Sequence, residues 1–414
     1  MKTVGTFLIT IALIVGLVSC VYPPPFPEQY NLTISSTEGG SVTTPGEGTF
    51  TYWDMDWVEL VAEADEGYHF VEWTGDVGSI ADVNAANTTI TMSDAYSITA
   101  NFALGIALEI WDWYDLDGIR GNLGGSYILM DDLDSTTAGY EELASSRANE
   151  GKGWRPIGTY DDQFTGSFDG QGYKIRDLFI NRADESGVGL FCDVASDGGI
   201  IKYIGVVNVT VTGNSSVGGL VGGNSGTVRN SYSAGSVTGS EYIGGLVGYS
   251  TGTVSNSYSR GNVTGTGRSQ SLSVGGLVGL NTGTVSNAHS SANVTGTGEQ
   301  QSLYVGGLVG VNTGTVSNSY SSGNVTGERW SSYVGGLVGG NTGTVSNSFW
   351  DIETSGRATS AGGTGKTTAE MKSVATFAGW NIMTVANPTT RNPSYIWNIV
   401  EGQTYPFLRW EPIS

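Results

Sequence analysis

The sequence predicts an all-β protein in which a small antiparallel β domain precedes a parallel β-solenoid with a C-terminal cap. Three observations support this prediction. Short segments of alternating apolar and polar residues, separated by Gly and Pro turns, fill the first part of the chain. A Gly-rich unit then recurs five times between residues 217 and 349. Finally, 64 of the 414 residues are glycine without the Gly-X-Y period of collagen.

The start of the chain predicts export. Lys2 precedes the run FLITIALIVGLVS, whose 13 residues are too few for a membrane-spanning helix and are typical of a signal peptide. The run ends in LVSC, which resembles a bacterial lipobox, and this resemblance implies cleavage before Cys20 and lipidation of its thiol. Ordinary secretion, with Cys20 as an incidental thiol, is the alternative. We therefore expect a lipoprotein signal at residues 1–19, a Pro-rich tether at residues 20–30, and a lipid-anchored protein at the cell surface or an extracellular one.

Residues 31–103 are expected to form the small antiparallel β domain. The segments NLTISST, SVTT, WVELVAEA, TTITM and SITANFA are strand-like, and turns such as TPGEG separate them. The motifs GYHFVEWTGD and ITANF resemble the divergent internalin B-repeat domains of bacterial surface proteins. This resemblance implies a spacer or adhesion module with Tyr68, Phe70, Trp73 and Phe102 in its core.

The distribution of charge argues against nucleic acid as a partner. Between Glu28 and Glu150 there are 23 acidic residues and only two basic ones, Arg120 and Arg147. The rest of the chain is close to neutral. Neither part offers the basic stripe that binding to nucleic acid requires.

The repeated unit predicts a solenoid. The tripeptide GGL begins at five positions separated by 26, 31, 31 and 29 residues, and GTV begins eight residues after each of them. One such unit cannot bury its apolar face alone, whereas stacked units cover one another. Each contains three strand-like pieces, such as VGGLVG, GTVSNSYS and GNVTG, with Gly or Asn at the corners. We expect coils about 4.8 Å apart.

Stacking also predicts columns of like residues, one from each coil. The sequence places a valine, an asparagine and an aromatic residue at fixed positions of the unit. The columns are Val228, Val254, Val285, Val316 and Val345; Asn230, Asn256, Asn287, Asn318 and Asn347; and Tyr232, Tyr258, His289, Tyr320 and Phe349.

The five copies of GLVG resemble the GLUG-motif family, named for its Gly-Leu-hydrophobic-Gly signature. The resemblance implies a β-solenoid at residues 187–349, with the usual right-handed coiling. Segments such as GWRPIG and FTGSFDGQGYKIRDLFI look like the lead-in coils of such proteins and assign residues 104–186 to that role. The final segment, 350–414, is expected to cap the open end through a short helix at 368–377, because an uncovered coil exposes a sheet edge.

The sequence predicts no catalytic residue, cofactor or metal site, so we expect a protein that is not an enzyme. GLUG motifs also occur in some IgA-specific metallopeptidases, but the zinc-binding H-E-x-x-H motif is absent and the only histidines are His69 and His289. Both are better explained as structural residues. Cys192, in the apolar stretch VGLFCDV, is expected to pack as a small hydrophobic residue. The acidic residues of the first domain show no calcium-loop spacing.

One enzymatic alternative stays open, because β-helices host polysaccharide lyases and glycoside hydrolases. Such enzymes use paired carboxylates or calcium on the outer face of the helix. The carboxylates that could serve are Asp131, Asp132, Asp134, Asp161, Asp162 and Asp169.

The variable inserts after each VTG predict a binding ridge. They leave one corner of the solenoid, so they should line up, and in solenoids such insertions often lie on the binding face. They carry Trp, Tyr and Arg, the residue types enriched in binding hot spots. We expect adhesion or surface interaction with a glycan or a surface protein, and a spacer without a ligand is the first alternative. The ridge residues are Arg268, Gln270, Glu299, Gln300, Gln301, Tyr304, Arg329, Trp330 and Tyr333.

Overall fold

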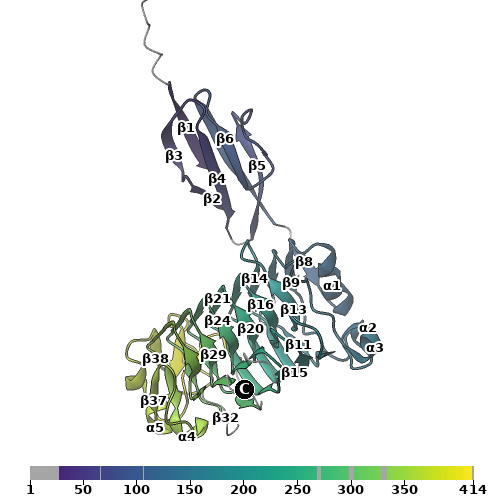
Figure 1. Ribbon diagram of the computed structural model, residues 1–414, viewed down its shortest axis with the longest axis vertical. Coiled ribbons are helices and arrows are strands. Elements are labelled where there is room, and N and C mark those ends of the chain that lie inside the picture. The colour runs from purple at the N-terminus through teal and green to yellow at the C-terminus, as the bar shows by residue number, and fades with distance from the viewer. Residues whose placement is uncertain are drawn as a thin grey trace, which may run out of the picture. The chain divides into compact units, whose positions relative to one another are not determined.

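Figure 1 shows the computed structural model of the chain, which describes residues 28–65, 67–105, 107–267, 272–297, 303–327 and 333–412. The chain folds into two compact units that divide between Gly105 and Ile106. The signal peptide, Cys20 and most of the expected tether lie outside the described residues.

The first unit consists of two sheets packed around one core. One sheet has the strand order β3-β1-β7-β5, and the other has the order β2-β4-β6. The strands are β1 (Gln29–Ser36), β2 (Gly40–Thr44), β3 (Gly48–Trp53), β4 (Trp57–Ala64), β5 (Tyr68–Gly75), β6 (Asn87–Thr91) and β7 (Tyr96–Leu104).

The prediction that this unit is purely antiparallel is wrong for one pair of strands. β1 and β7 run parallel, with Leu32 beside Tyr96 and Ser36 beside Ala100, whereas the other pairs among the described strands of the unit are antiparallel. The first and last strands can run in the same direction because the whole intervening chain serves as their crossover connection.

The predicted aromatic core of this unit is confirmed. Trp73 and Phe102 are buried, and the half-buried Tyr68 and Phe70 pack against the same cluster. The ring of Phe70 lies 5.7 Å from that of Trp73 and 5.8 Å from that of Phe102. His69 alternates with these residues along β5, and its side chain is exposed.

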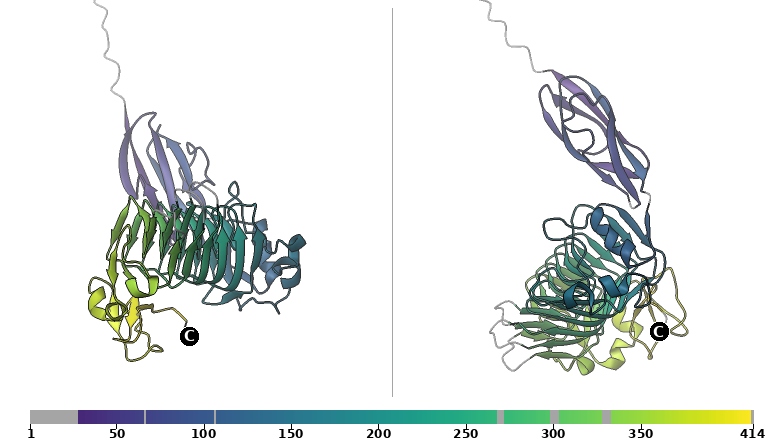
Figure 2. Two further views of the ribbon diagram at one scale, coloured as in Figure 1. Left: turned by 60° about the horizontal axis from the view of Figure 1, so that its bottom comes forward. Right: turned by 90° about the vertical axis from the view of Figure 1, so that its right-hand side faces the viewer.

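The second unit is the predicted parallel β-solenoid, visible in Figure 2 as a stack of coils. Four parallel sheets run along the stack: two of them extend into the lead-in coils, the third begins at Phe191 and the fourth at Tyr242. The longest sheet path has nine strands: β8 (Leu108–Ile110), β9 (Ser126–Leu129), β10 (Ser167–Asp169), β14 (Ile200–Lys202), β17 (Thr227–Arg229), β21 (Thr253–Ser255), β25 (Thr284–Ser286), β30 (Thr315–Ser317) and β35 (Thr344–Ser346).

The second sheet carries the aromatic column and is the largest. Its strands are β11 (Lys174–Arg176), β12 (Phe179–Arg182), β15 (Gly205–Gly213), β18 (Tyr232–Gly239), β22 (Tyr258–Gly265), β26 (His289–Ser290), β27 (Asn293–Gly296), β31 (Tyr320–Ser321), β32 (Val325–Gly327), β36 (Phe349–Asp351) and β37 (Thr364–Lys366).

The other two sheets flank the GGL tripeptides. One contains β13 (Phe191–Val194), β16 (Val221–Asn224), β20 (Val247–Ser250), β24 (Val278–Asn281), β29 (Val309–Asn312) and β34 (Val338–Asn341). The last contains β19 (Tyr242–Gly244), β23 (Leu272–Gly275), β28 (Leu303–Gly306) and β33 (Tyr333–Gly335).

Each full repeat from β19 onward therefore contributes strands to four sheets, whereas the sequence predicted three strand segments per repeat. The predicted piece GTVSNSYS divides at its asparagine, because Asn256 has a φ of 47° and turns the chain between β21 and β22. The predicted piece around GGL divides as well: β19 ends at Gly244 and β20 begins at Val247. Leu246, which lies between these two strands, is fully buried.

The interior of the stack consists of apolar columns. The GGL leucines Leu220, Leu246, Leu277, Leu308 and Leu337 are all fully buried. Four members of the predicted valine column are also fully buried, and Val345, in the last coil, is partly buried against the same core. Neighbouring coils place these residues in direct register, for example Val254 beside Val285.

Asparagine and glycine have different structural roles in the repeat. All five members of the asparagine column have positive φ values, between 44° and 51°, which are left-handed corners that asparagine tolerates. The GGL glycines are needed for close approach instead. A Cβ atom on Gly275 would lie 1.9 Å from the carbonyl oxygen of Val278 and 2.6 Å from the amide nitrogen of Gly310 in the next coil.

A second asparagine column, which the sequence analysis missed, runs inside the stack. Asn281 donates a side-chain hydrogen bond to the side chain of Asn312 (2.7 Å), which donates to that of Asn341 (2.8 Å). Asn281 and Asn312 are fully buried. Such amide ladders satisfy buried polar groups from one coil to the next.

Short helices accompany the first coils. α1 buries Trp113 and Leu116 in the solenoid core, and Asp112 caps its N-terminus by accepting from two backbone amides. The helices of the lead-in region are α1 (Trp113–Gly118), the 3-10 helix η1 (Ile119–Gly121), α2 (Tyr140–Leu143) and α3 (Ala148–Gly151).

The last coil is covered by an extended segment rather than by the expected helix at 368–377. Thr359 accepts from the amide of Gly336, and the amides of Ala361 and Thr364 donate to Val338 and Ser348. These hydrogen bonds satisfy the edge of the final coil. Residues 359–364 therefore cap the last coil, a role that the sequence analysis assigned to 368–377.

The remaining C-terminal residues, 368–412, pack along the side of the stack, against the aromatic column. We call this segment the C-terminal clamp. In Figure 2 it is the yellow region beside the last coils. α4 (Ile352–Ser355) precedes it, and its own elements are α5 (Thr368–Met371), the 3-10 helix η2 (Val374–Phe377), β38 (Ile382–Thr384), β39 (Trp397–Ile399) and β40 (Phe407–Leu408).

Replacing Gly275 with alanine should destabilise the solenoid, because the new methyl group would collide with backbone of its own and the next coil. Overpacking of this kind costs about 1–3 kcal/mol, measured as a lower midpoint of thermal unfolding. Gly118→Ala is the matched control: Gly118 has a helical φ of −60°, and a Cβ there meets nothing within 4 Å. Equal midpoints for the two variants would contradict the close-approach argument.

Candidate recognition surface

The described residues that flank the inserts lie at one corner of the solenoid, which we call the insert edge. Among the described residues it comprises 183–187, 214–216 and 240–242, together with the residues beside the three longer inserts: 266–267, 272–273, 297, 303–304, 327 and 333. The edge is continuous from coil to coil: the amide of Gly187 donates to Ser215 (3.0 Å), and the Ser215 hydroxyl donates to the Glu241 carboxylate (2.7 Å). This corner is where the sequence placed the binding ridge.

Two of the predicted ridge residues lie in the described part of the chain. Tyr304 and Tyr333 are register partners on β28 and β33, and their rings are stacked with centroids 4.7 Å apart. Tyr304 is half-buried, and Tyr333 is 46% exposed. The others lie outside the described residues: Arg268, Gln270, Glu299, Gln300, Gln301, Arg329 and Trp330.

The same register adds one tyrosine that the sequence analysis did not name, and a second tyrosine packs against it. Tyr242 occupies the position of Tyr304 two coils earlier, with Ser273 between them in the ladder. Its ring lies 6.0 Å from that of Tyr249 on the adjacent strand. The signal was present in the sequence, because each of these ladder residues stands two places before a GGL tripeptide. Tyrosine therefore recurs beside the inserts.

The predicted aromatic column is confirmed, and the clamp covers it. The rings of Tyr232 and Tyr258 lie 4.7 Å apart, and His289 stacks between Tyr258 and Tyr320 at 4.9 Å from each. The clamp packs Trp410 against Tyr258, and Trp397 against both His289 and Tyr320. Most of the column is consequently buried and serves as a docking site for the clamp rather than as a free surface.

A buried ionic contact, which the sequence did not reveal, joins the clamp to the column. Glu411 is 5% exposed; its carboxylate pairs with Arg260 and lies 3.3 Å from Nε2 of His289. Burial alone would raise the pKa of Glu411, but His289 and Arg260 hold it below its usual value. His289 is thus a member of the column that also contacts the clamp, in agreement with a structural role.

The carboxylates weighed as enzymatic candidates have structural partners in several cases. Asp132 accepts from the amide of Lys174 and pairs with Arg176 at 3.3 Å. Asp134 accepts from Thr136 within a turn, and these hydrogen bonds lower its pKa. Asp169 lies 3.3 Å from Nζ of Lys202, and burial raises its pKa. Asp131 and Asp161 are exposed, and Asp162 lines a pocket.

Cys192 packs as the sequence predicted. It is buried on β13, next to Gly187 and Tyr160. Burial and then the nearby Asp193 raise the pKa of its thiol to about 12. The side chain is therefore a neutral thiol at physiological pH, which is a poor nucleophile.

Two features are absent from the described ranges. No three His, Cys, Asp or Glu side chains there gather closely enough to hold a metal ion. Within the same ranges, no helix is long and apolar enough to cross a membrane.

Family comparisons confirm the resemblances to the divergent internalin B-repeat domain and to the GLUG motif. Residues 30–105 match the divergent InlB B-repeat domain. The GLUG motif matches four times, at residues 213–238, 239–264, 270–295 and 301–326. The chain thus carries one divergent InlB B-repeat domain followed by a series of GLUG motifs.

The proteins that resemble the chain include two curated proteins and a solved structure. Halomucin of Haloquadratum walsbyi is 34% identical over an alignment of 225 positions that covers 49% of this chain and 2% of halomucin. A protein of Evansella cellulosilytica, provisionally named a Gly-rich membrane protein, is 36% identical over 120 residues, 28% of this chain and 13% of that protein. This chain therefore matches only a small part of either relative.

The solved structure supports the fold alone. It is a crystal structure from Bacteroides ovatus, provisionally described as an immunoglobulin A1 protease, with 20% identity and a TM-score of 0.56. The similarity covers 74% of this chain and 93% of that one.

Replacing Glu411 with glutamine should loosen the clamp, because Arg260 and His289 lose their buried carboxylate. Removal of one partner of a buried pair costs about 3–5 kcal/mol, and the 42% exposure of the Arg260 side chain places the expected loss near the lower value. Urea unfolding and tryptophan fluorescence of the clamp measure it. Glu142→Gln, at an exposed helix position, is the control. A Glu411→Gln variant as stable as that control would contradict the role of the pair.

Acid should weaken the same contact. The pKa of Glu411 is lower in the folded chain than its ordinary value of 4.5, so its carboxylate stabilises the fold above 4.5. This contribution is lost as the pH falls through the lower, folded pKa. Urea midpoints of the wild type and Glu411→Gln, compared from neutral pH to below 4.5, should therefore converge in acid. A difference between them that persists or grows in acid would contradict the shift.

Proposed function

We propose that this chain, which joins a divergent InlB B-repeat domain to a stack of GLUG motifs, is a surface recognition protein without catalytic turnover. Cys20 is its lipid anchor, and the InlB B-repeat domain spaces the solenoid from the membrane. Recognition takes place along the insert edge, where the chain binds a glycan or a protein of another surface. The membrane, through the lipid anchor, and this ligand are the proposed partners, and nucleic acid is not.

The observation that carries the proposal is the pair of stacked tyrosines at the insert edge. Tyr304 and Tyr333 lie in register with ring centroids 4.7 Å apart, and Tyr333 is 46% exposed. Leu and Val fill the interior of the stack, and neither tyrosine belongs to this hydrophobic core. Core packing therefore does not explain why tyrosines occupy these two positions. Rigid aromatic side chains offer a large contact area at a low entropic cost on binding.

The relatives support a location outside the cell. One is a halomucin and another is named, provisionally, a membrane protein. The lipobox-like LVSC sequence at Cys20 points the same way. The near-neutral repeats lack the basic surface that would favour nucleic acid.

The test is an array of glycans and extracellular-matrix proteins probed with the full chain and with a Tyr304→Ser/Tyr333→Ser variant. Serine is a matched replacement because Ser273 occupies the same ladder between Tyr242 and Tyr304. We expect the variant to keep the wild-type unfolding midpoint and to lose bound signal at least tenfold, as the loss of an aromatic hot spot predicts.

Tyr173→Ser is the control, because Tyr173 is 37% exposed and lies outside the insert edge. Equal binding by the wild type and the double variant would contradict recognition through these rings. No binding by any folded version would favour the spacer function. Turnover of an arrayed polysaccharide would instead favour a carbohydrate-active enzyme.

A further inference from the structure

A pocket of about 390 Å³ opens at the N-terminal end of the insert edge. Its wall combines three arginines with two carboxylates and a tyrosine: Arg120, Arg155, Arg182, Asp162, Glu185 and Tyr160. The pocket reaches the edge through Gly187, whose amide donates to Ser215 of the next coil. Its volume falls within the range of about 300–1,000 Å³ that is usual for small-ligand sites.

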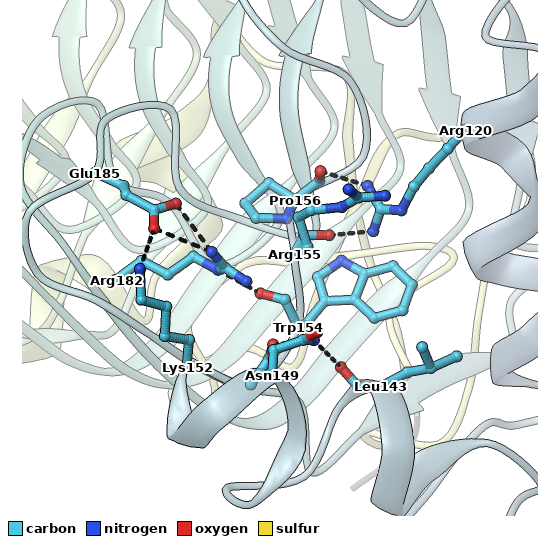
Figure 3. Close-up of polar contacts among 10 residues, drawn as sticks. Arg120, Leu143, Asn149, Lys152, Trp154, Arg155, Pro156, Arg182 and Glu185 are labelled. Carbon is cyan, nitrogen blue, oxygen red and sulfur yellow. Dashed lines mark hydrogen bonds and ion pairs between the residues drawn. The ribbon is translucent and has the colours of Figure 1, made fainter.

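Two of the arginines are fixed in place by backbone carbonyls, as Figure 3 shows. Nε of Arg182 donates to the carbonyl of Trp154 (2.9 Å), and Nη1 donates to Glu185 (3.0 Å). Arg120 donates to the carbonyls of Arg155 and Pro156, and its guanidinium lies 4.9 Å from the centre of the Trp154 ring. The wall of the pocket is therefore rigid before any ligand arrives.

The third arginine, Arg155, differs from the other two in its exposure and in its partners. It is exposed between Trp154 and Pro156, which are both buried. Trp154 anchors this stretch, since its Nε1 donates to the carbonyl of Leu190 at 3.1 Å. The guanidinium of Arg155 has no hydrogen bond or ion pair with the described residues, whereas those of Arg120 and Arg182 are paired with Asp117 and Glu185. Arg155 is thus a free donor on a fixed backbone.

The charges around the pocket favour a single anionic group. The ionised lining residues and their direct ion-pair partners are four bases, Arg120, Lys152, Arg155 and Arg182, and three acids, Asp117, Asp162 and Glu185. The one excess positive charge stands out in a chain whose formal net charge is −21. A phosphate dianion would meet the carboxylates of Asp162 and Glu185, whereas sugar hydroxyls can donate hydrogen bonds to them.

We propose that this pocket binds a monosaccharide unit that carries one carboxylate, a hexuronate or a sialate of an extracellular glycan. Arg155 binds the carboxylate through the paired N–H groups of its guanidinium, a geometry suited to carboxylates. Asp162 and Glu185 accept from the ring hydroxyls, and Thr159 contributes a hydroxyl of its own. This inference deepens the proposed function, on which it rests, by naming a ligand class at one end of the insert edge.

The test is ligand-observed NMR and calorimetry on the full chain with single sugars. The probes are methyl glucuronide, the methyl glycoside of N-acetylneuraminate, methyl glucoside and inorganic phosphate. We expect one of the acidic sugars to bind with a Kd of about 1 mM or tighter. The neutral glucoside and phosphate should bind at least tenfold more weakly. The two acidic probes distinguish a hexuronate from a sialate.

Arg155→Gln should weaken the acidic sugar at least tenfold, the effect of one charge-assisted hydrogen bond, without a change in unfolding midpoint. Arg147→Gln is the control, because the Arg147 side chain is 86% exposed and lies outside the pocket. Unchanged affinity in Arg155→Gln, equal binding of the neutral glucoside, or tighter binding of phosphate would each overturn the proposal. Arg155→Gln changes the pocket and leaves Tyr304 and Tyr333 intact, so a failure of the pocket is separable from a failure of the tyrosine edge, which the array measures.

Discussion

The structure depends on register between successive coils. One coil is too thin to cover its own leucines and valines, so every buried side chain needs a like neighbour in the coils above and below. Backbone ladders set that spacing, and the GGL glycines permit it, because a Cβ atom on Gly275 would lie 2.6 Å from the amide nitrogen of Gly310 in the next coil. The same register stacks the aromatic column and aligns the buried amides of Asn281 and Asn312.

Register between coils also determines which segments of the chain can vary in length. The repeats are held by neutral side chains, and length variation is confined to the insert edge. Charged groups interact strongly at two places outside the Leu and Val interior: Glu411 of the clamp pairs with Arg260 on β22, and the arginines gather in the lead-in coils, where Arg120 and Arg182 hold one wall of a pocket. The stack, whose repeats are close to neutral in charge, thus places Tyr304 and Tyr333 at its corner and the arginine pocket at its N-terminal end.

The sequence predicted the parts of the fold that repeat, because five registered copies reveal which residues stack. The Leu and Val interior, the aromatic column and the asparagine corners follow from that pattern. Features that leave no local pattern in the sequence were not predicted. The parallel pairing of β1 with β7 depends on tertiary packing, and the contact of Glu411 with Arg260 joins residues 151 apart in the chain. At the insert edge the sequence identified Tyr304 and Tyr333 by composition, whereas the arginine pocket needed the folded lead-in coils.

Native-state hydrogen exchange tests the dependence on register most directly. The amides of Thr253, Thr284 and Thr315 occupy one position of three successive coils, and each donates to the preceding coil. The account predicts that they are strongly protected and exchange through one shared opening, because no coil is stable without its neighbours. Rapid or independent exchange of Thr284, while the flanking coils stay protected, would contradict it.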